Sequence, residues 1–380
     1  MGEWQTFRFG DVTINYDSKR IPIRSAARKR GVYPYYGASG IVDYVDDYLF
    51  DGEQLLVAEA GENLRTRKTP IGFMATEKFW VNNHAHIVQG NTIANTRYLG
   101  YALAGTDIAG FLSGSTQPKL TQNALNRIEL RLPERWHQDA VVTLLGALDD
   151  KIAVNERIAD VTRSLGEATF RAALGRSSIE RDLDSISVAL IRGVTPRYSD
   201  DPDELVVLNQ KCIRGGRVSL DPARRTIAER VSDEKIVRRG DILVNSTGVG
   251  TLGRVARWTG AVKCTADSHV TIVRLDENKI DPVCAGFAVL AAQPEIERLG
   301  EGSTGQTELS RAKLGSFRVI LPDSDGCAAL RPILEALEER ADAAIQESTT
   351  LAQLRDTLLP KLMSGELRVR DAERAVAEAT

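Results

Sequence analysis

The sequence predicts a mixed α/β protein with two similar modules, separated by an antiparallel pair of long coiled-coil-like helices and related by an internal pseudo-twofold repeat. Three observations predict this fold. The length of 380 residues exceeds what a single core usually accommodates. One sequence pattern occurs twice in the chain. Two further segments have few turn signals and carry apolar residues at helical spacing.

The internal repeat is clearest in GSTQPKLTQNALNRIELRLP (114–133) and GSTGQTELSRAKLGSFRVILP (302–322). Leu120 of the first copy recurs as Leu309, 189 residues later, and the other matching apolar positions keep the same offset. In both copies a hydroxyl residue follows this leucine, and an apolar segment ending in Leu-Pro comes after. The repeat therefore extends beyond a single short motif.

The repeat continues in both directions. Downstream, LGALDDK (145–151) becomes LEALEER at the same offset. Upstream, GEQLLVAEAG (52–61) resembles GDILVNSTG (240–248), and HAHIV (84–88) resembles HVTIV (269–273). Four matches in the same order indicate that the chain arose by duplication.

Composition divides each half into a module and a helix. The modules are rich in Gly, Tyr, Thr and short β-like runs with brief helical stretches, which favours compact α/β structure. The predicted parts are a first module at 1–135, a first helix with its linker at 136–182, a second module at 183–326, a second helix at 327–367, and a C-terminal tail at 368–380.

Each predicted helix carries a narrow apolar stripe, with charged residues outside it. Such a stripe needs a partner, and the duplicated helix is the simplest one available. The alternative, in which each helix lies on its own module, stays open. The residues predicted to pair the helices are Leu145, Leu148, Ile152, Leu165, Leu334, Leu337, Leu354 and Leu358.

The sequence lacks the short motifs of common catalytic sites. It has no GxxxxGK[ST], no HExxH and no Asn-Pro-Pro-aromatic tetrapeptide. The segment GVGTLG (248–253) matches GxGxxG, but a strand-like segment follows it, which favours a tight glycine loop over a dinucleotide site. The four histidines are too scattered for a metal site. We therefore expect no catalytic residue, metal or cofactor in this chain, and interpret it as a binding protein.

Localisation is predicted from similar absences. The N-terminus has no apolar signal region, no apolar run is long enough to span a bilayer, and the four cysteines form no CxxC pair. A cytoplasmic protein with reduced thiols is expected.

Charge is unevenly distributed, although 49 basic and 52 acidic residues leave a net charge of only −3. Residues 206–260 hold eleven basic against five acidic residues, and 1–40 hold seven against three. Basic modules and polar, aromatic or glycine-rich loops suit contacts with phosphates and base edges. Solvated surface and ordinary turns are the competing interpretation. The candidate DNA contacts are Arg28, Lys29, Arg30, Tyr36, Ser39, Arg65, Arg67, Lys68, Ser115, Thr116, Gln117, Lys119, Arg214, Arg217, Arg238, Asn245, Ser246, Thr247, Arg254, Ser303, Thr304, Gln306 and Lys313.

With these motifs, the chain resembles the DNA-specificity subunit of a Type I restriction–modification system. The resemblance rests on YYGASGIVDYVDDYLFDGEQLLVAEAGEN (35–63), on the segment 114–152 and on their repeats. It implies two target-recognition domains that each read one half of a split DNA sequence, and two helices that fix the distance between the halves. It also implies a non-catalytic chain whose partners are double-stranded DNA, two methyltransferase subunits that bind S-adenosylmethionine, and in the full complex translocase–nuclease subunits.

The chain departs from the family pattern just after each repeat. The family usually has an acidic-Gln pair there, whereas this chain has His137-Gln138 in the first copy and Asp325-Gly-Cys327 in the second. Two other functions remain as alternatives: a coiled-coil adaptor that binds protein, and, less favoured, a DNA methyltransferase or nuclease with a degenerate site. The recognised bases, the methylated base and the spacer length do not follow from the sequence.

Overall fold

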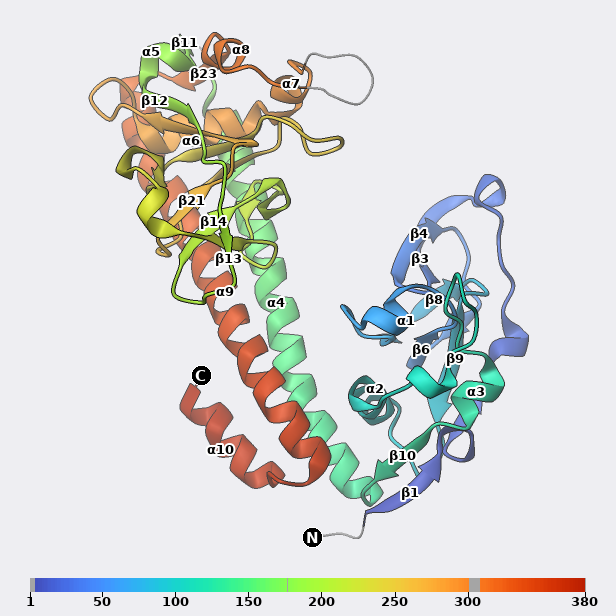
Figure 1. Cartoon of the computed structure of the whole chain (residues 1–380). Coiled ribbons are helices and arrows are strands. Elements are labelled where there is room, and N and C mark those ends of the chain that lie inside the picture. Colours follow the sequence, from blue (N-terminus) through green and yellow to red (C-terminus); the bar gives the residue numbers. More distant parts are fainter. Residues whose placement is uncertain (1–3, 176, 301–307, 380) are drawn as a thin grey trace. The chain divides into compact units, whose positions relative to one another are not determined.

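A computed structural model describes residues 4–175, 177–300 and 308–379 of the chain. It divides into two compact units, one formed by residues 1–152 with 349–380 and the other by 153–348. Each unit combines an α/β module with segments of two long helices (Figure 1). The mixed α/β fold predicted from the sequence is confirmed. None of the described helices is long and apolar enough to cross a bilayer.

The first module contains two four-stranded sheets. The first sheet is antiparallel, in the order β2 (Thr13–Asn15), β9 (Ala85–Gly90), β6 (Gln54–Ala58), β7 (Gly72–Ala75). The second has the order β4 (Gly40–Val45), β3 (Arg30–Gly37), β8 (Lys78–Val81), β5 (Phe50–Asp51), with β3 and β8 parallel. Strand β1 (Gln5–Arg8) pairs with β10 (Glu129–Leu132). The helices are α1 (Asn63–Thr66), α2 (Thr96–Gly105) and α3 (Gln122–Asn126), with short 3-10 turns at Phe9–Asp11, Asp17–Lys19, Ser25–Ala27 and Ala109–Phe111.

The second module repeats this plan. An antiparallel sheet has the order β12 (Ser187–Arg192), β22 (Val270–Leu275), β19 (Ile242–Asn245), β20 (Val255–Arg257). A second sheet has the order β13 (Tyr198–Ser199), β17 (Arg224–Thr226), β14 (Leu205–Leu208), β21 (Cys264–Ala266), β18 (Ile236–Val237), with β14 and β21 parallel. Strand β11 (Ser178–Asp182) pairs with β23 (Arg318–Pro322), and β15 (Ile213–Arg214) with β16 (Arg217–Val218). The helices are α5 (Leu183–Ile186), α6 (Pro282–Ala291), α7 (Gln293–Glu297) and α8 (Arg311–Gly315), with 3-10 turns at Gln210–Cys212, Ala228–Arg230 and Asp233–Lys235.

The repeated sequence motif forms the same local structure in both modules. The side chains of Thr121 and Ser310 accept hydrogen bonds from backbone N–H groups and cap α3 and α8. In each module a strand follows the capped helix and leads into a long helix, α4 (Arg135–Ala173) or α9 (Ser324–Ser364). The duplication inferred from the sequence is therefore also a duplication of structure.

The long helices pair in opposite directions within each unit. In the first unit, Leu145 and Leu148 of α4 belong to one buried cluster with Leu351 and Leu358 of α9. In the second unit, Ala159 of α4 is buried with Ala341 and Ala344 of α9. Because α9 numbers fall as α4 numbers rise, the pairing is antiparallel, as predicted. Ile152 and Leu354 pack against the cluster of the first unit, and Leu334 is buried in the core of the second.

One predicted pairing residue is wrong. Leu165 is 53% exposed, and Val161, one turn earlier, is 58% exposed. The inward position is taken by Gly166, where an added Cβ would lie 2.9 Å from the ring of Phe287 and 3.9 Å from Leu337. The ring of Phe287 in α6 packs so closely against α4 here that a side chain at position 166 would require it to shift.

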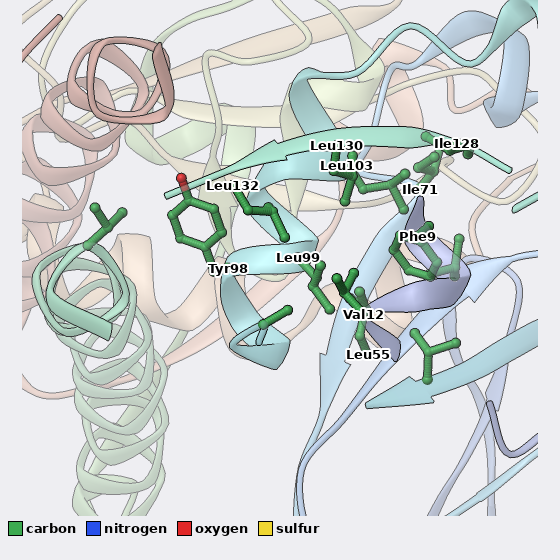
Figure 2. Close-up of a cluster of buried hydrophobic side chains, with 14 of the residues drawn as sticks. Phe9, Val12, Leu55, Ile71, Tyr98, Leu99, Leu103, Ile128, Leu130 and Leu132 are labelled. Carbon is green, nitrogen blue, oxygen red and sulfur yellow. The ribbon is translucent and has the colours of Figure 1, made fainter. Parts of the chain in front are cut away.

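Two predicted boundaries also move. Ser178–Asp182, assigned to the linker, forms β11 and pairs with β23, so the second module begins before residue 183. The segment assigned to a C-terminal tail contains the helix α10 (Val369–Ala379), and Ala372 is buried in the core of the first unit. Figure 2 shows part of that core, where side chains of the first sheet, α2 and β10 meet, among them Leu55, Leu99 and Leu130.

Candidate nucleic-acid interface

In the first module, three loops meet beyond the carboxyl end of β6. We name residues 59–69, 82–84 and 113–119 the first loop cluster. The N–H of Glu59 donates to the carbonyl of His84 at 2.8 Å, and the N–H of Gly61 donates to Pro118 at 3.1 Å. The ends of the third loop are closed by reciprocal backbone hydrogen bonds between Ser113 and Lys119, of 2.9 and 2.7 Å. Backbone contacts therefore fix the three loops against one another.

The first loop cluster collects six exposed candidate residues. They are Arg65, Lys68, Ser115, Thr116, Gln117 and Lys119. The guanidinium of Arg65 donates to the carbonyl oxygens of Gly114 at 2.8 Å and Ser115 at 3.1 Å, so it links the short helix α1 to the third loop. Segments 59–69 and 113–119 hold four basic and two acidic residues. Cations and hydroxyl or amide groups side by side can bind phosphates and base edges.

Three other candidates in this module have structural roles. Arg28 forms an ion pair of 3.0 Å with Asp43, and its guanidinium lies 4.4 Å from the ring centroid of Tyr35. Tyr36 packs against two phenylalanine rings, and burial raises the pKa of its hydroxyl. Arg67 donates to the last carbonyl groups of α2 at 2.7 and 3.1 Å. These contacts give the three residues structural roles, and their contact with DNA stays a prediction.

The remaining candidates of this module lie at opposite ends of β3. Ser39 is exposed in the turn after β3, three residues after Tyr36, whose carbonyl accepts from the N–H of Asn82 of the first loop cluster at 2.9 Å. Lys29 and Arg30 are exposed at the start of the same strand. Ser39 therefore borders the first loop cluster, whereas the two cations do not.

The second module forms a corresponding second loop cluster, which consists of residues 246–254, 267–269 and 308–310. The N–H of Leu309 donates to Ser246 at 2.8 Å, and the N–H of Ser246 donates to His269 at 2.8 Å. The Thr247 hydroxyl lies 2.7 Å from His269 Nδ1 and 2.8 Å from Gln210 Nε2. The glycine loop 248–253 lies between two strands, as the sequence predicted, and its glycines have positive φ.

Two candidates of the second module are buried, which corrects their assignment to DNA contact. Asn245 and Ser246 are both fully buried. The amide of Asn245 donates to the carbonyl of Gln210 at 3.0 Å, and the Ser246 hydroxyl lies 2.5 Å from that of Thr271. They lie in and directly after β19, a central strand whose side chains face packed structure on both sides. They are internal hydrogen-bonding residues.

Thr247 and Arg254 belong to the second loop cluster, and Arg254 donates to the carbonyl of Gly250 at 2.7 Å. Lys313 lies in α8, directly after this cluster. The candidates Ser303, Thr304 and Gln306 lie outside the described residues.

Three basic candidates lie elsewhere in the second module. Arg214 and Arg217 are on the β15–β16 hairpin, and Arg217 forms an ion pair of 3.0 Å with Asp160 of α4. Arg238 precedes β19, at the end of that strand opposite to Thr247. Among the described residues, no hydrogen bond or ion pair joins these three side chains to the second loop cluster.

Sequence analysis missed an arginine behind each loop cluster. Arg20 donates to Glu59 at 2.8 Å and to the carbonyl of Ala85 at 2.9 Å. Arg192 donates to Glu308 at 2.7 Å and to the carbonyl of Leu309 at 2.9 Å. Neither arginine lies in a repeated motif, so no signal in the sequence indicated that they support the loops.

Each module is also fastened to the long helices by polar contacts. In the first unit, Asp149 of α4 accepts from Tyr101 of α2 at 3.0 Å and from Arg355 of α9 at 2.8 Å. In the second unit, Arg257 at the end of β20 forms a buried ion pair with Glu338 of α9, and Thr259 donates to Asp342 at 2.9 Å. Each module thus has a defined orientation on its own helix segments.

The arrangement defines a class of protein in which two similar modules each present a polar loop cluster, with an excess of basic residues in the first. Residues 1–162 match the family model described as the Type I restriction modification DNA specificity domain. A putative type I restriction enzyme specificity subunit from Haemophilus influenzae is 36% identical over 150 residues, which cover 38% of this chain and 37% of that protein. The type I restriction enzyme EcoprrI specificity subunit from Escherichia coli is 26% identical over 132 residues, which cover 35% and 31%.

The chain thus spans only about a third of the length of the curated relatives that it matches, 37% of one and 31% of the other. Its fold is similar to that of the S subunit of a Type I restriction–modification system from M. genitalium, with a TM-score of 0.63, 16% identity, and coverage of 95% of this chain and 96% of that one. The resemblance to Type I specificity subunits that the sequence motifs indicated is confirmed.

Proposed function

We propose that the chain is the DNA-binding specificity subunit of a Type I restriction–modification complex. In this proposal the first loop cluster reads one half of a split DNA target and the second loop cluster reads the other half. The observation that carries the proposal is the duplication, because two modules of the same topology place loops from equivalent strands at equivalent ends. The specificity domain matched by residues 1–162 supports it.

We further propose that this chain is a non-catalytic scaffold. Its partners would be two methyltransferase subunits, which would bind S-adenosylmethionine, and in the full complex also translocase–nuclease subunits. The lack of an Asn-Pro-Pro-aromatic tetrapeptide and of a GxxxxGK[ST] motif in the sequence supports a division of labour in which this chain supplies only recognition. The antiparallel helices α4 and α9 would set the separation of the half-sites.

The test combines target identification with binding. Sequencing of modified bases in the source genome should give a split motif, and a duplex carrying it should bind the full chain, together with its methyltransferase subunits, in an anisotropy assay. Scrambling either half should abolish specific binding, and affinity should fall steeply with salt because phosphate contacts release counterions. Salt-insensitive binding to a protein partner without DNA retention would instead favour the adaptor function, and methyl transfer by the purified chain alone would contradict a scaffold.

A further inference from the structure

His86 lies behind the first loop cluster and has hydrogen-bond acceptors on both ring nitrogens. It is the second residue of β9 and is only 1% exposed. Nδ1 lies 2.5 Å from a carboxylate oxygen of Asp17, and Nε2 lies 2.8 Å from the carbonyl oxygen of Leu120. A neutral imidazole carries one N–H, whereas both contacts require a donor. The geometry therefore favours the imidazolium.

The charges around His86 agree with this protonation state. Asp17 is held as an acceptor, since its other oxygen accepts from the N–H of Ile87 at 2.9 Å. Arg20 lies 3.4 Å from Asp17 and 2.8 Å from Glu59, which completes a group of two cations and two carboxylates. Burial alone lowers the pKa of His86, but the hydrogen bonds to Asp17 and Leu120 and the charges of Asp17 and Glu59 raise it above its ordinary value overall. Burial opposes the shift at Asp17 too, yet its contacts with His86, Ile87 and Arg20 lower its pKa.

The contact with Leu120 acts directly on the loop that carries Ser115–Lys119. Leu120 follows this loop, is fully buried, and donates its own N–H to Glu59 at 2.9 Å. When His86 loses a proton, Asp17 retains the remaining N–H, because the charged bond is the stronger of the two. The lone pair of Nε2 then faces the Leu120 carbonyl, so the attraction at the base of the loop becomes a repulsion.

The second module has a neutral residue at the equivalent place. In the repeat HAHIV and HVTIV, His86 corresponds to Thr271. The Thr271 hydroxyl lies 2.5 Å from that of Ser246, which in turn accepts from the N–H of Leu309 through its carbonyl at 2.8 Å. This connection contains no group that titrates near neutral pH.

We propose that His86 is a positioning residue which, as the imidazolium, holds loop 113–119 in its DNA-reading conformation, so that this attachment depends on pH, whereas the corresponding attachment of the second loop cluster through Thr271 and Ser246 does not. The proposal rests on the proposed function for its DNA-reading part, whereas the attachment of the loop stands on the geometry alone. The stabilisation is complete below the ordinary histidine pKa of about 6.5. It is lost as the pH rises through the raised pKa of His86.

The first experiment needs no DNA. Hydrogen–deuterium exchange of the full chain, corrected for intrinsic rates, should show protection of 113–121 falling as the pH rises, while that of 308–316 stays constant. Each unit by which the pKa of His86 is higher with the loop attached than with it detached corresponds to about a tenfold change in the protection factor of 113–121. His86→Thr, which copies the second module, should remove the pH dependence. Protection of 113–121 in the wild-type chain that does not change from about pH 5.5 to 9 would overturn the proposal, even if the variant failed to fold.

The second experiment uses the duplex with the split motif, bound by the chain with its methyltransferase subunits. Raising the pH should reduce discrimination against a scrambled first half about tenfold per unit of that pKa difference. Discrimination in the second half should fall less, because His86 has no counterpart in the second module. Equal loss in both halves would contradict the asymmetry. If the protection of 113–121 depends on pH but the chain binds no DNA, the proposed function and the reading role of the loop are refuted. The hydrogen–deuterium exchange would then establish only that His86 attaches the loop.

Discussion

Charged side chains have two different roles in this molecule, and the role of each depends on whether it is exposed or buried. Arg65 is exposed and shapes a loop surface, whereas Arg257 is nearly buried and joins a module to a helix. Exposed contacts add little to stability but can decide binding, while a buried charge that loses its partner is costly. The two kinds of residue should therefore respond oppositely to substitution.

We expect Arg65→Ala to weaken DNA binding with little effect on the free energy of unfolding. The substitution removes a cation and the two hydrogen bonds from its guanidinium to loop 113–119. If the lost contact is to a phosphate, the slope of log affinity against log salt should fall by about one. Lys29→Ala, the same loss of charge at the far end of β3, is the matched control and should bind as the wild type does. Equal effects of both substitutions would show that only overall charge matters.

We expect Glu338→Gln to destabilise the second unit by about 3–5 kcal/mol, because Arg257 would stay buried without its counter-ion. The Nε of Arg257 has no hydrogen-bond partner, so its guanidinium depends on Glu338 and on the nearby charge of Asp342. Urea unfolding should show the loss, and the exposed neighbour Glu339→Gln should be close to neutral. A wild-type midpoint for Glu338→Gln would mean that the pair does not hold the module.

Among the elements, the paired helices were the most predictable and their inward faces the least. Sequence periodicity located α4 and α9 and their direction of pairing, because an apolar stripe of that length needs a partner. Periodicity wrongly predicted that Leu165 faces the partner helix. The close approach of Phe287 to Gly166 is a tertiary contact, which helical spacing cannot predict. The capped helices α3 and α8 were visible as a repeated motif, because capping is a local interaction.

Lengthening both helices should lengthen the spacer between the half-sites. Ile158 packs opposite Ala341 and Ala344, so seven residues inserted after Ile158 need seven more in α9 at that level to keep the pairing. One heptad adds about 10 Å, at roughly 1.5 Å per residue, or about three base pairs. Modified-base sequencing should show the longer spacer with both half-sites unchanged. A spacer of the original length would show that the helices do not set the distance.

For the whole molecule, the duplication predicts independent readers. Replacing residues 1–134 with the module of another specificity subunit should change one half of the motif and leave the other intact. Each module has its own core and its own polar attachment to the helices, which is the physical basis of that independence. Modified-base sequencing is again the measurement, and a simultaneous change in both halves would contradict it.

The loop clusters were only partly predictable from the sequence, because contacts between distant segments build them. The repeats identified residues 114–119 and Thr247, because hydroxyl and glycine residues recur there. They could not show that Asn245 and Ser246 lie inside the module, because the burial of β19 depends on neighbouring strands that come from distant segments of the chain. Arg20 and Arg192 act through long-range pairs that no local pattern records.

The glycine that follows α9 lies next to the start of the first module. Gly365 has a φ of +77°, and a Cβ added to it would lie 3.1 Å from the indole nitrogen of Trp4, so the start of the first module and the end of the second helix meet. A circular permutant that begins at β11 should therefore keep both modules and both helices.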